Sequence, residues 1–119
     1  MKIDTVRIFV TDIARSKLFY TESIGMPLAK DGSDHGFFIL NGGGANLLIE
    51  RADSNDEEGK QLIGRFTGIS LRADNIHSVC ARLKAQGITF TGEPEKQWWG
   101  GTLAHFQDPD GNIITLCGD

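Results

Sequence analysis

The chain has 119 residues, and its 12 Lys and Arg against 16 Asp and Glu give a formal net charge of −4. This length fits one modest domain with a real core, and 39% hydrophobic residues exclude a disordered or fibrous protein. The acidic balance excludes a sequence-independent grip on nucleic acid, which needs a basic surface. No stretch reaches roughly 18 consecutive apolar residues. We therefore expect neither nucleic acid nor a membrane among its partners.

The N-terminal segment and the cysteines indicate the cellular compartment. Residues 1–10 lack the long apolar core of a signal peptide. Cys80 and Cys117 are the only cysteines, and two cysteines do not make a disulfide framework. We expect a cytoplasmic protein.

The first half of the chain predicts one helix and four strands. Residues 5–10 alternate aliphatic and mixed side chains, the pattern of a strand with one buried face. Asp12 then starts a helix that ends at Gly25. An Asp side chain accepts hydrogen bonds from the free backbone N–H groups at a helix start, and Gly readily adopts the left-handed conformation that ends many helices. Strand-like segments separated by Gly-containing turns follow at 27–31, 36–40 and 45–50.

The second half predicts the same order of elements after an acidic segment at about 52–65, which we expect to be a solvated loop. Residues 68–73 alternate as a strand, and a helix with one apolar face follows. Its apolar face consists of Ile76, Val79, Cys80 and Leu83. Cys80 is therefore expected to be buried and inert. Three more strands are expected at 88–92, 101–107 and 112–117, the last two joined by the turn Asp108–Gly111.

The two halves form an internal repeat. Residues 9–28 resemble residues 71–90, with Asp12 matching Asp74 and Gly25 matching Gly87 at a spacing of 62 residues. The later strands match at a spacing of 67 residues, which leaves an additional segment containing two tryptophans in the second half. The repeat predicts an α+β fold of two tandem βαβββ modules in a single domain. We place module 1 at about 1–51, the linker loop at about 52–65 and module 2 at about 66–119.

This pattern resembles the vicinal oxygen chelate superfamily, which includes glyoxalase I, extradiol dioxygenases, fosfomycin-resistance thiol transferases and bleomycin-resistance proteins. The residues that carry the resemblance are Val10, Thr11, Asp12, Ile13, Ser16, Phe19, Tyr20, Gly25, their second-half repeat, and the terminal pattern Phe106, Asp108, Pro109, Asp110, Gly111, Asn112 and Leu116. The resemblance covers the whole chain. It implies modules that form a curled mixed sheet around a concave cleft, and a homodimer whose clefts take strands from both chains.

The resemblance also implies where the metal enzymes of this superfamily carry their ligands. Those four positions are occupied here by Thr5, Leu48, Gly68 and Thr115. A divalent metal in such a site needs imidazole or carboxylate ligands, which these residues do not supply. We therefore expect no metal and no cofactor, as in the bleomycin-resistance-like members that lack a metal.

Other polar residues are candidates for chemistry in the cleft. The resemblance to the thiol-transferase branch places His105 against a substrate. Glu50 shares the strand face of Leu48, and a His105–Glu50 pair would suit proton transfer, since a carboxylate can orient an imidazole. Arg7 has the same inward parity and suits an anionic group. The alternatives are that Glu50 is solvated and that Arg7 pairs with Glu50 or reaches solvent.

Aromatic residues suggest binding of a planar molecule. Trp98 and Trp99 resemble the Trp-Gly segment of many bleomycin-resistance-like members, and an indole can stack on a planar or cationic ligand. The alternative is that one of them is buried at the edge of the core or at a dimer interface. Phe38 is the counterpart of His105 at the 67-residue spacing and would add another aromatic wall.

The leading hypothesis is a metal-independent homodimer that binds a small aromatic or amphipathic molecule, such as an antibiotic. The expected ligand-binding residues are Thr5, Arg7, Phe38, Leu48, Ser70, Trp98, Trp99, His105 and Thr115. Two other functions stay open. One is an enzyme of lyase, isomerase or thiol-transferase type with a non-standard or absent metal site and His105 as the acid or base. The other is a regulatory or scaffold dimer with a vestigial cleft.

Overall fold

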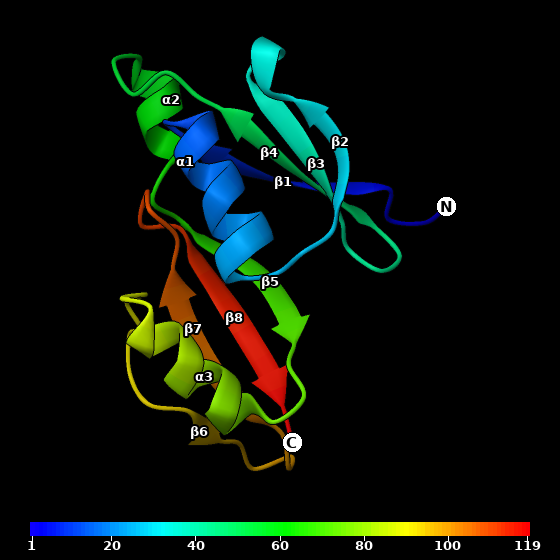
Figure 1. Ribbon diagram of the computed structural model, residues 1–119, viewed down its shortest axis with the longest axis vertical. Coiled ribbons are helices and arrows are strands. Elements are labelled where there is room, and N and C mark those ends of the chain that lie inside the picture. The colour runs from blue at the N-terminus through cyan, green and yellow to red at the C-terminus, as the bar shows by residue number, and fades with distance from the viewer. The chain divides into compact units, whose positions relative to one another are not determined.

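Two four-stranded sheets, each with its own helix, organise the chain (Figure 1). The computed structural model describes all residues from Met1 to Asp119, and they fall into two units. Unit 1 is Met1–Arg65 and unit 2 is Phe66–Asp119. Each unit contains a strand, a helix and three further strands in that order, which is the predicted βαβββ repeat. That the two units act as a single domain stays a prediction.

Unit 1 is a mixed sheet with one main helix packed on it. Its elements are β1 (Thr5–Val10), α1 (Ile13–Leu18), a π-helical turn (Phe19–Ser23), β2 (Leu28–Gly32), a 3₁₀ turn (Ser33–His35), β3 (Phe37–Asn41), β4 (Asn46–Arg51) and α2 (Glu57–Leu62). The strand order is β1-β4-β3-β2. β1 and β4 are parallel and the other pairs are antiparallel.

The start and end of α1 follow the predicted capping residues. The side chain of Asp12 accepts a hydrogen bond from the backbone N–H of Arg15 at 3.1 Å. After the π-helical turn, Gly25 has a φ of +84°, the left-handed conformation that glycine adopts without a steric penalty. The Asp-to-Gly helix signal is therefore confirmed.

The acidic segment between the modules is more ordered than the sequence predicts. We expected a solvated loop over about 52–65, but Glu57–Leu62 form the short helix α2. Glu57 and Glu58 lie in its first turn, where negative side chains interact favourably with the helix dipole. Gly59 is buried against the carbonyl of Asp53, where a β-carbon would have no room. The same charges that suggested a loop thus stabilise a helix start.

Unit 2 repeats the arrangement of unit 1. Its elements are β5 (Phe66–Arg72), α3 (Ile76–Ala85), β6 (Glu95–Lys96), β7 (Thr102–Gln107) and β8 (Ile113–Gly118). The strand order is β5-β8-β7-β6, with β5 and β8 parallel. The predicted apolar face of α3 is confirmed, because Ile76, Cys80 and Leu83 are buried. Burial raises the pKa of the Cys80 thiol, as expected for an inert cysteine.

One predicted strand is wrong. Residues 88–92 form only an isolated bridge between Phe90 and Phe106, and the pairing with β7 resumes at the two-residue strand β6. Pro94 lies between these two contacts and has no backbone N–H to donate to a neighbouring strand. The edge strand of unit 2 is therefore interrupted. By contrast, the corresponding edge strand of unit 1, β2, pairs with β3 almost continuously.

Each unit has its own set of buried residues, which come from one face of its strands and from the helix of that unit. In unit 1 the fully buried side chains include Ile8, Val10, Tyr20, Phe38, Leu40 and Ile49. In unit 2 they include Ile76, Leu83, Phe106 and Ile114. None of the helices has the length and hydrophobicity needed to cross a membrane. The opposite strand faces, which these cores leave uncovered, hold the candidate site.

Candidate functional site

The sheet face of unit 1 that points away from its core carries a mixed set of side chains. Strand register places Arg7 of β1 beside Leu48 of β4, and Leu48 beside Ile39 of β3. One step further along the strands, Glu50 lies beside Phe37. These five residues alternate with the buried positions, as strand geometry requires. The face thus combines apolar walls with one acid and one base.

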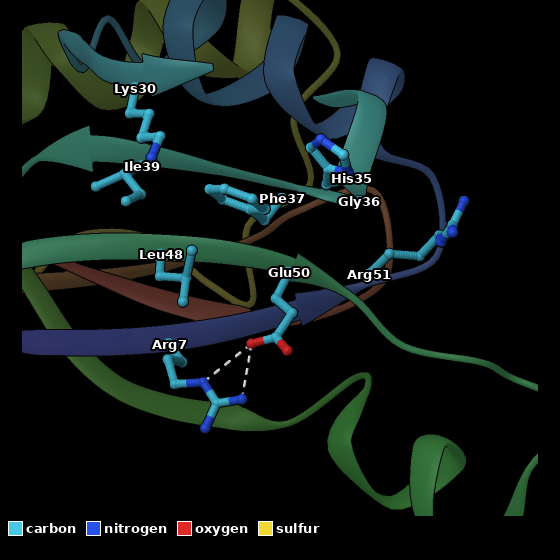
Figure 2. Close-up of a pocket in the computed structure, with 9 residues that line it drawn as sticks. All are labelled: Arg7, Lys30, His35, Gly36, Phe37, Ile39, Leu48, Glu50 and Arg51. Carbon is cyan, nitrogen blue, oxygen red and sulfur yellow. Dashed lines mark hydrogen bonds and ion pairs between the residues drawn. The ribbon is translucent and has the colours of Figure 1, made fainter. Parts of the chain in front are cut away.

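An open cleft of about 550 Å³ lies on this face of unit 1 (Figure 2). The residues that line it are Arg7, Lys30, His35, Gly36, Phe37, Ile39, Leu48, Glu50 and Arg51. A cleft of this size and mixed lining is typical of sites for small organic molecules.

Arg7 and Glu50 form an ion pair at one side of the cleft. Both Nε and Nη2 of Arg7 donate to Oε1 of Glu50, at 3.0 Å and 2.7 Å. The guanidinium also lies 5.0 Å from the centre of the Phe9 ring. Of the alternatives for Arg7 and Glu50, mutual pairing is the arrangement that the structure contains. Because both side chains are partly exposed, the pair adds little to stability and leaves polar atoms for a ligand.

Phe37 forms the aromatic wall of the cleft. Its ring lies directly on Gly32, where an added β-carbon would collide with the ring. Lys30, on the same edge strand as Gly32, places its Nζ 5.9 Å from the centre of the Phe37 ring. A residue without a side chain at position 32 therefore allows Phe37 to lie flat at this edge of the sheet.

Phe38, which we expected in the ligand site, is placed elsewhere. Its side chain is completely buried, and it points to the core face of β3 while Phe37 and Ile39 line the cleft. Successive side chains of a strand point to opposite faces, so Phe38 cannot share the face of its two neighbours. Sequence alternation alone would have found Phe37 and Ile39.

In unit 2, the corresponding sheet face gathers three of the predicted residues. His105 of β7 and Ser70 of β5 both lie beside Thr115 of β8. Nδ1 of His105 and Oγ1 of Thr115 are joined by a hydrogen bond of 2.8 Å. The Phe66 ring lies 5.9 Å from the imidazole, centre to centre. His105 also borders a small hollow of about 150 Å³ whose rim includes Glu93.

The predicted pair of His105 and Glu50 joins residues of different units. Glu50 belongs to unit 1, where Arg7 is its partner, and His105 belongs to unit 2, where Thr115 is its partner. Proton transfer between His105 and Glu50 therefore stays a prediction.

The two tryptophans occupy the tip of the hairpin between β6 and β7. The N–H of Gly100 donates to the carbonyl of Gln97 at 3.0 Å, which closes a tight turn. Trp98 is 95% exposed, whereas Trp99 lies on Gly101, where a β-carbon would collide with the indole. Trp98 therefore projects into solvent, and Trp99 packs back on its own hairpin.

The four positions at which the resemblance implies metal ligands carry neither imidazole nor carboxylate. The Thr5 hydroxyl donates to the carboxylate of Asp4, Leu48 lines the cleft, and Thr115 is bonded to His105. Gly68 has no side chain. No group of three or more His, Cys, Asp or Glu side chains comes together in the structure. Imidazole and carboxylate ligands are what a divalent ion requires, and this set of residues does not fit one.

A strongly perturbed carboxylate lies outside the cleft. Hydrogen bonds from the Ser33 hydroxyl, the Lys17 ammonium and the Ser33 N–H hold the pKa of Asp31 well below its usual value. These contacts tie β2 to the turn that follows it and to α1. The shift has a structural cause, and Asp31 does not line the cleft.

Comparison with known proteins decides the family. Residues 2–116 match the family described as the Glyoxalase/Bleomycin resistance protein/Dioxygenase superfamily. The chain belongs to this superfamily. The resemblance that the repeat and the terminal pattern suggested is thereby confirmed over nearly the whole chain.

Two relatives in this superfamily have different descriptions. The probable lactoylglutathione lyase of Vibrio parahaemolyticus is 31% identical over 117 residues, which cover 90% of this chain and 83% of that protein. The bleomycin resistance protein of Klebsiella pneumoniae is 29% identical over 92 residues, which cover 68% of this chain and 73% of that protein. The chain is thus similar both to a protein described as a probable lyase and to one described as a resistance protein.

Solved structures confirm the α+β fold. A superfamily member from Sphaerobacter thermophilus matches with a TM-score of 0.84 and 28% identity, over 100% of this chain and 98% of that one. TnmS3, an antibiotic binding protein from Streptomyces sp. CB03234, matches with a TM-score of 0.75 and 31% identity, over 99% and 95%.

Proposed function

We propose that this superfamily member binds a small aromatic or amphipathic molecule, without a metal, in a site that includes the cleft of unit 1. The observation that carries the proposal is the lining of this cleft. Phe37, Ile39 and Leu48 give it apolar walls, and the Arg7–Glu50 pair supplies polar atoms at one side. Leu48 occupies a position at which the resemblance implies a metal ligand, so an apolar contact would replace a coordination bond there.

The similarity to TnmS3 supports binding as the function, because that protein is described as antibiotic binding. An antibiotic is accordingly one class of ligand to test. We further propose that the protein is a cytoplasmic homodimer, in which strands from both chains complete each site. Thr5, Ser70, Thr115, Trp98 and Trp99 would then contribute to the same ligand site.

An enzymatic function is the second candidate, and one observation favours it. The hydrogen bond to Thr115 fixes the orientation of the His105 imidazole, which leaves Nε2 to exchange a proton with a substrate. The relationship to a probable lactoylglutathione lyase points the same way. Under this function His105→Ala abolishes turnover, whereas ligand binding by the cleft residues of unit 1 persists.

Truncation of the apolar wall tests the binding function. We expect Leu48→Ala to weaken binding of planar compounds by about tenfold or more, because the change removes apolar contact worth about 0.8 kcal/mol per methylene. Isothermal titration calorimetry with a panel of planar drugs measures the effect. Leu28→Ala is the matched control, since Leu28 is an exposed leucine of the same sheet outside the cleft. Equal losses in both variants, or a panel without any ligand, would refute the proposed site.

Elemental analysis tests the absence of a metal. We expect protein purified without chelators to contain no stoichiometric divalent ion, because none of the four ligand positions carries imidazole or carboxylate. Addition of chelator should leave ligand affinity unchanged. One tightly held divalent ion per chain would contradict the metal-free proposal and favour the enzyme.

A further inference from the structure

The cleft of unit 1 has a charge opposite to that of the chain. The chain as a whole has a formal charge of −4, yet the cleft lining contains Arg7, Lys30 and Arg51 against the single carboxylate of Glu50. Arg7 and Glu50 neutralise each other through two short hydrogen bonds. The local excess of positive charge therefore comes from Lys30 and Arg51.

Lys30 is the cation that faces the apolar wall. Figure 2 shows its ammonium group directed from β2 toward Ile39 and Phe37. Its Nζ lies 5.9 Å from the Phe37 ring centre, and it forms no ion pair with any carboxylate. A contact with a ring face satisfies an ammonium less than a carboxylate does. An anionic group held against Phe37 would give Lys30 the partner that the protein itself does not provide.

Arg51 lies at the rim of the cleft, and its side chain also borders a second hollow lined by residues of α1. Its side chain leaves the end of β4 and lies over Gly36, with Nη2 3.6 Å from the position that a β-carbon of Gly36 would take. Its backbone N–H donates to the carbonyl of Gly36 at 2.9 Å, which fixes the start of the side chain. Arg51 also has no carboxylate partner.

The small hollow described in unit 2 has the opposite charge to the cleft of unit 1. The small hollow of unit 2 is lined by Glu93 and Glu95 and by no lysine or arginine. The fold therefore does not impose a basic cleft, and the side chains of unit 1 determine the charge there.

We infer that the cleft of unit 1 selects organic anions, namely molecules with an apolar planar body and a carboxylate or similar anionic group. This inference rests on the proposed binding function and adds the charge of the ligand. The planar body would lie against Phe37, Ile39 and Leu48. The anionic group would take Lys30 as its main partner, with Arg51 and the outer atoms of Arg7 adding attraction.

Three naphthalene probes that share the ring system and carry a negative, a positive or a neutral substituent test the inference. We expect naphthalene carboxylate to bind about tenfold more tightly than naphthalene methylammonium, with naphthalene methanol between them, because the unpaired ammonium of Lys30 attracts the carboxylate and repels the second ammonium. Isothermal titration calorimetry measures all three affinities. Higher salt should narrow the difference, since the site is open to solvent.

Three lysine variants locate the effect, and two of them, Lys30→Gln and Lys60→Gln, have the same net charge. Lys30→Gln should remove most of the preference for the carboxylate, and Lys30→Glu should reverse it in favour of the ammonium. Lys60→Gln is the matched control, because Lys60 lies on α2, is paired with Glu57 and does not line the cleft. It should retain the preference of the unchanged protein.

The outcomes separate this inference from the proposed function. Equal binding of the three probes, with a loss in Leu48→Ala, would overturn the charge preference and leave the binding function intact. A preference for the carboxylate that persists in Lys30→Gln combined with Arg51→Gln would also overturn it. Failure of every probe to bind would overturn both proposals.

Discussion

Replacement of Phe38 by alanine is expected to lower the free energy of unfolding by about 3–5 kcal/mol, the usual cost of removing a buried phenylalanine. Phe38 has no exposed surface and packs on the core face of β3. The adjacent Phe37→Ala should cost much less stability, because Phe37 is partly exposed and lines the cleft. The loss in Phe37→Ala should instead appear in ligand affinity.

Urea unfolding followed by circular dichroism gives the two free energies, and calorimetry with naphthalene carboxylate gives the two affinities. Phe37→Ala and Phe38→Ala remove the same side chain from neighbouring positions of β3. The two variants therefore differ only in the face of the sheet that loses the ring. If Phe37→Ala proved as destabilising as Phe38→Ala, the assignment of the two faces of β3 would be wrong.

The opposite orientation of these two phenylalanines explains why the sequence analysis placed Phe38 in the ligand site, although it lies on the core face of β3. We matched Phe38 to His105 with the 67-residue spacing that holds between β4 and β8. Residues 42–45 join β3 to β4, but residues 108–112 join β7 to β8, so the second hairpin loop is one residue longer. His105 lies beside Thr115 as Ile39 lies beside Leu48, which makes Ile39 its true counterpart. A shift of one residue moves a side chain to the other face of a sheet.

Local signals in the sequence predicted most of the fold correctly. Capping by Asp12, the left-handed Gly25 and the apolar face of α3 depend on neighbouring residues, and each is confirmed. The family followed from the repeat and from the terminal pattern that ends at Leu116. These features need no knowledge of which strands pair.

The charge of the cleft and the contacts of Phe37 with Gly32 and Lys30 could not be predicted in this way. Lys30 and Arg51 become neighbours of Phe37 only through the order β1-β4-β3-β2, and no sequence period brings them together. The flat position of the Phe37 ring depends on the absence of a side chain at Gly32 across a strand pair. Such contacts between strands are set by tertiary packing and not by local preference.

The turn between β7 and β8 supplies the second large effect, because its aspartate is a buried hydrogen-bond acceptor. Oδ1 of Asp108 accepts from the N–H groups of Asp110 and Asn112, each at 2.9 Å. Oδ2 accepts from the side-chain amide of Asn112 at 2.9 Å. Asp108 and Asn112 are 5% and 1% exposed. The terminal pattern that identified the superfamily is thus a turn held together by its own side chains.

Asp108→Ala is expected to lower the free energy of unfolding by about 3 kcal/mol, because it removes the carboxylate that accepts hydrogen bonds from the buried backbone N–H and side-chain amide of Asn112. Each buried hydrogen bond lost in this way costs about 1–3 kcal/mol. Asp108→Asn keeps one acceptor oxygen and should cost less. Asp34→Ala removes the same charge from an exposed turn and should change stability by no more than about 0.5 kcal/mol. Urea unfolding of the three variants measures these differences. Similar losses in Asp108→Ala and Asp34→Ala would show that charge, and not the buried hydrogen bonds, determines the stability of the turn.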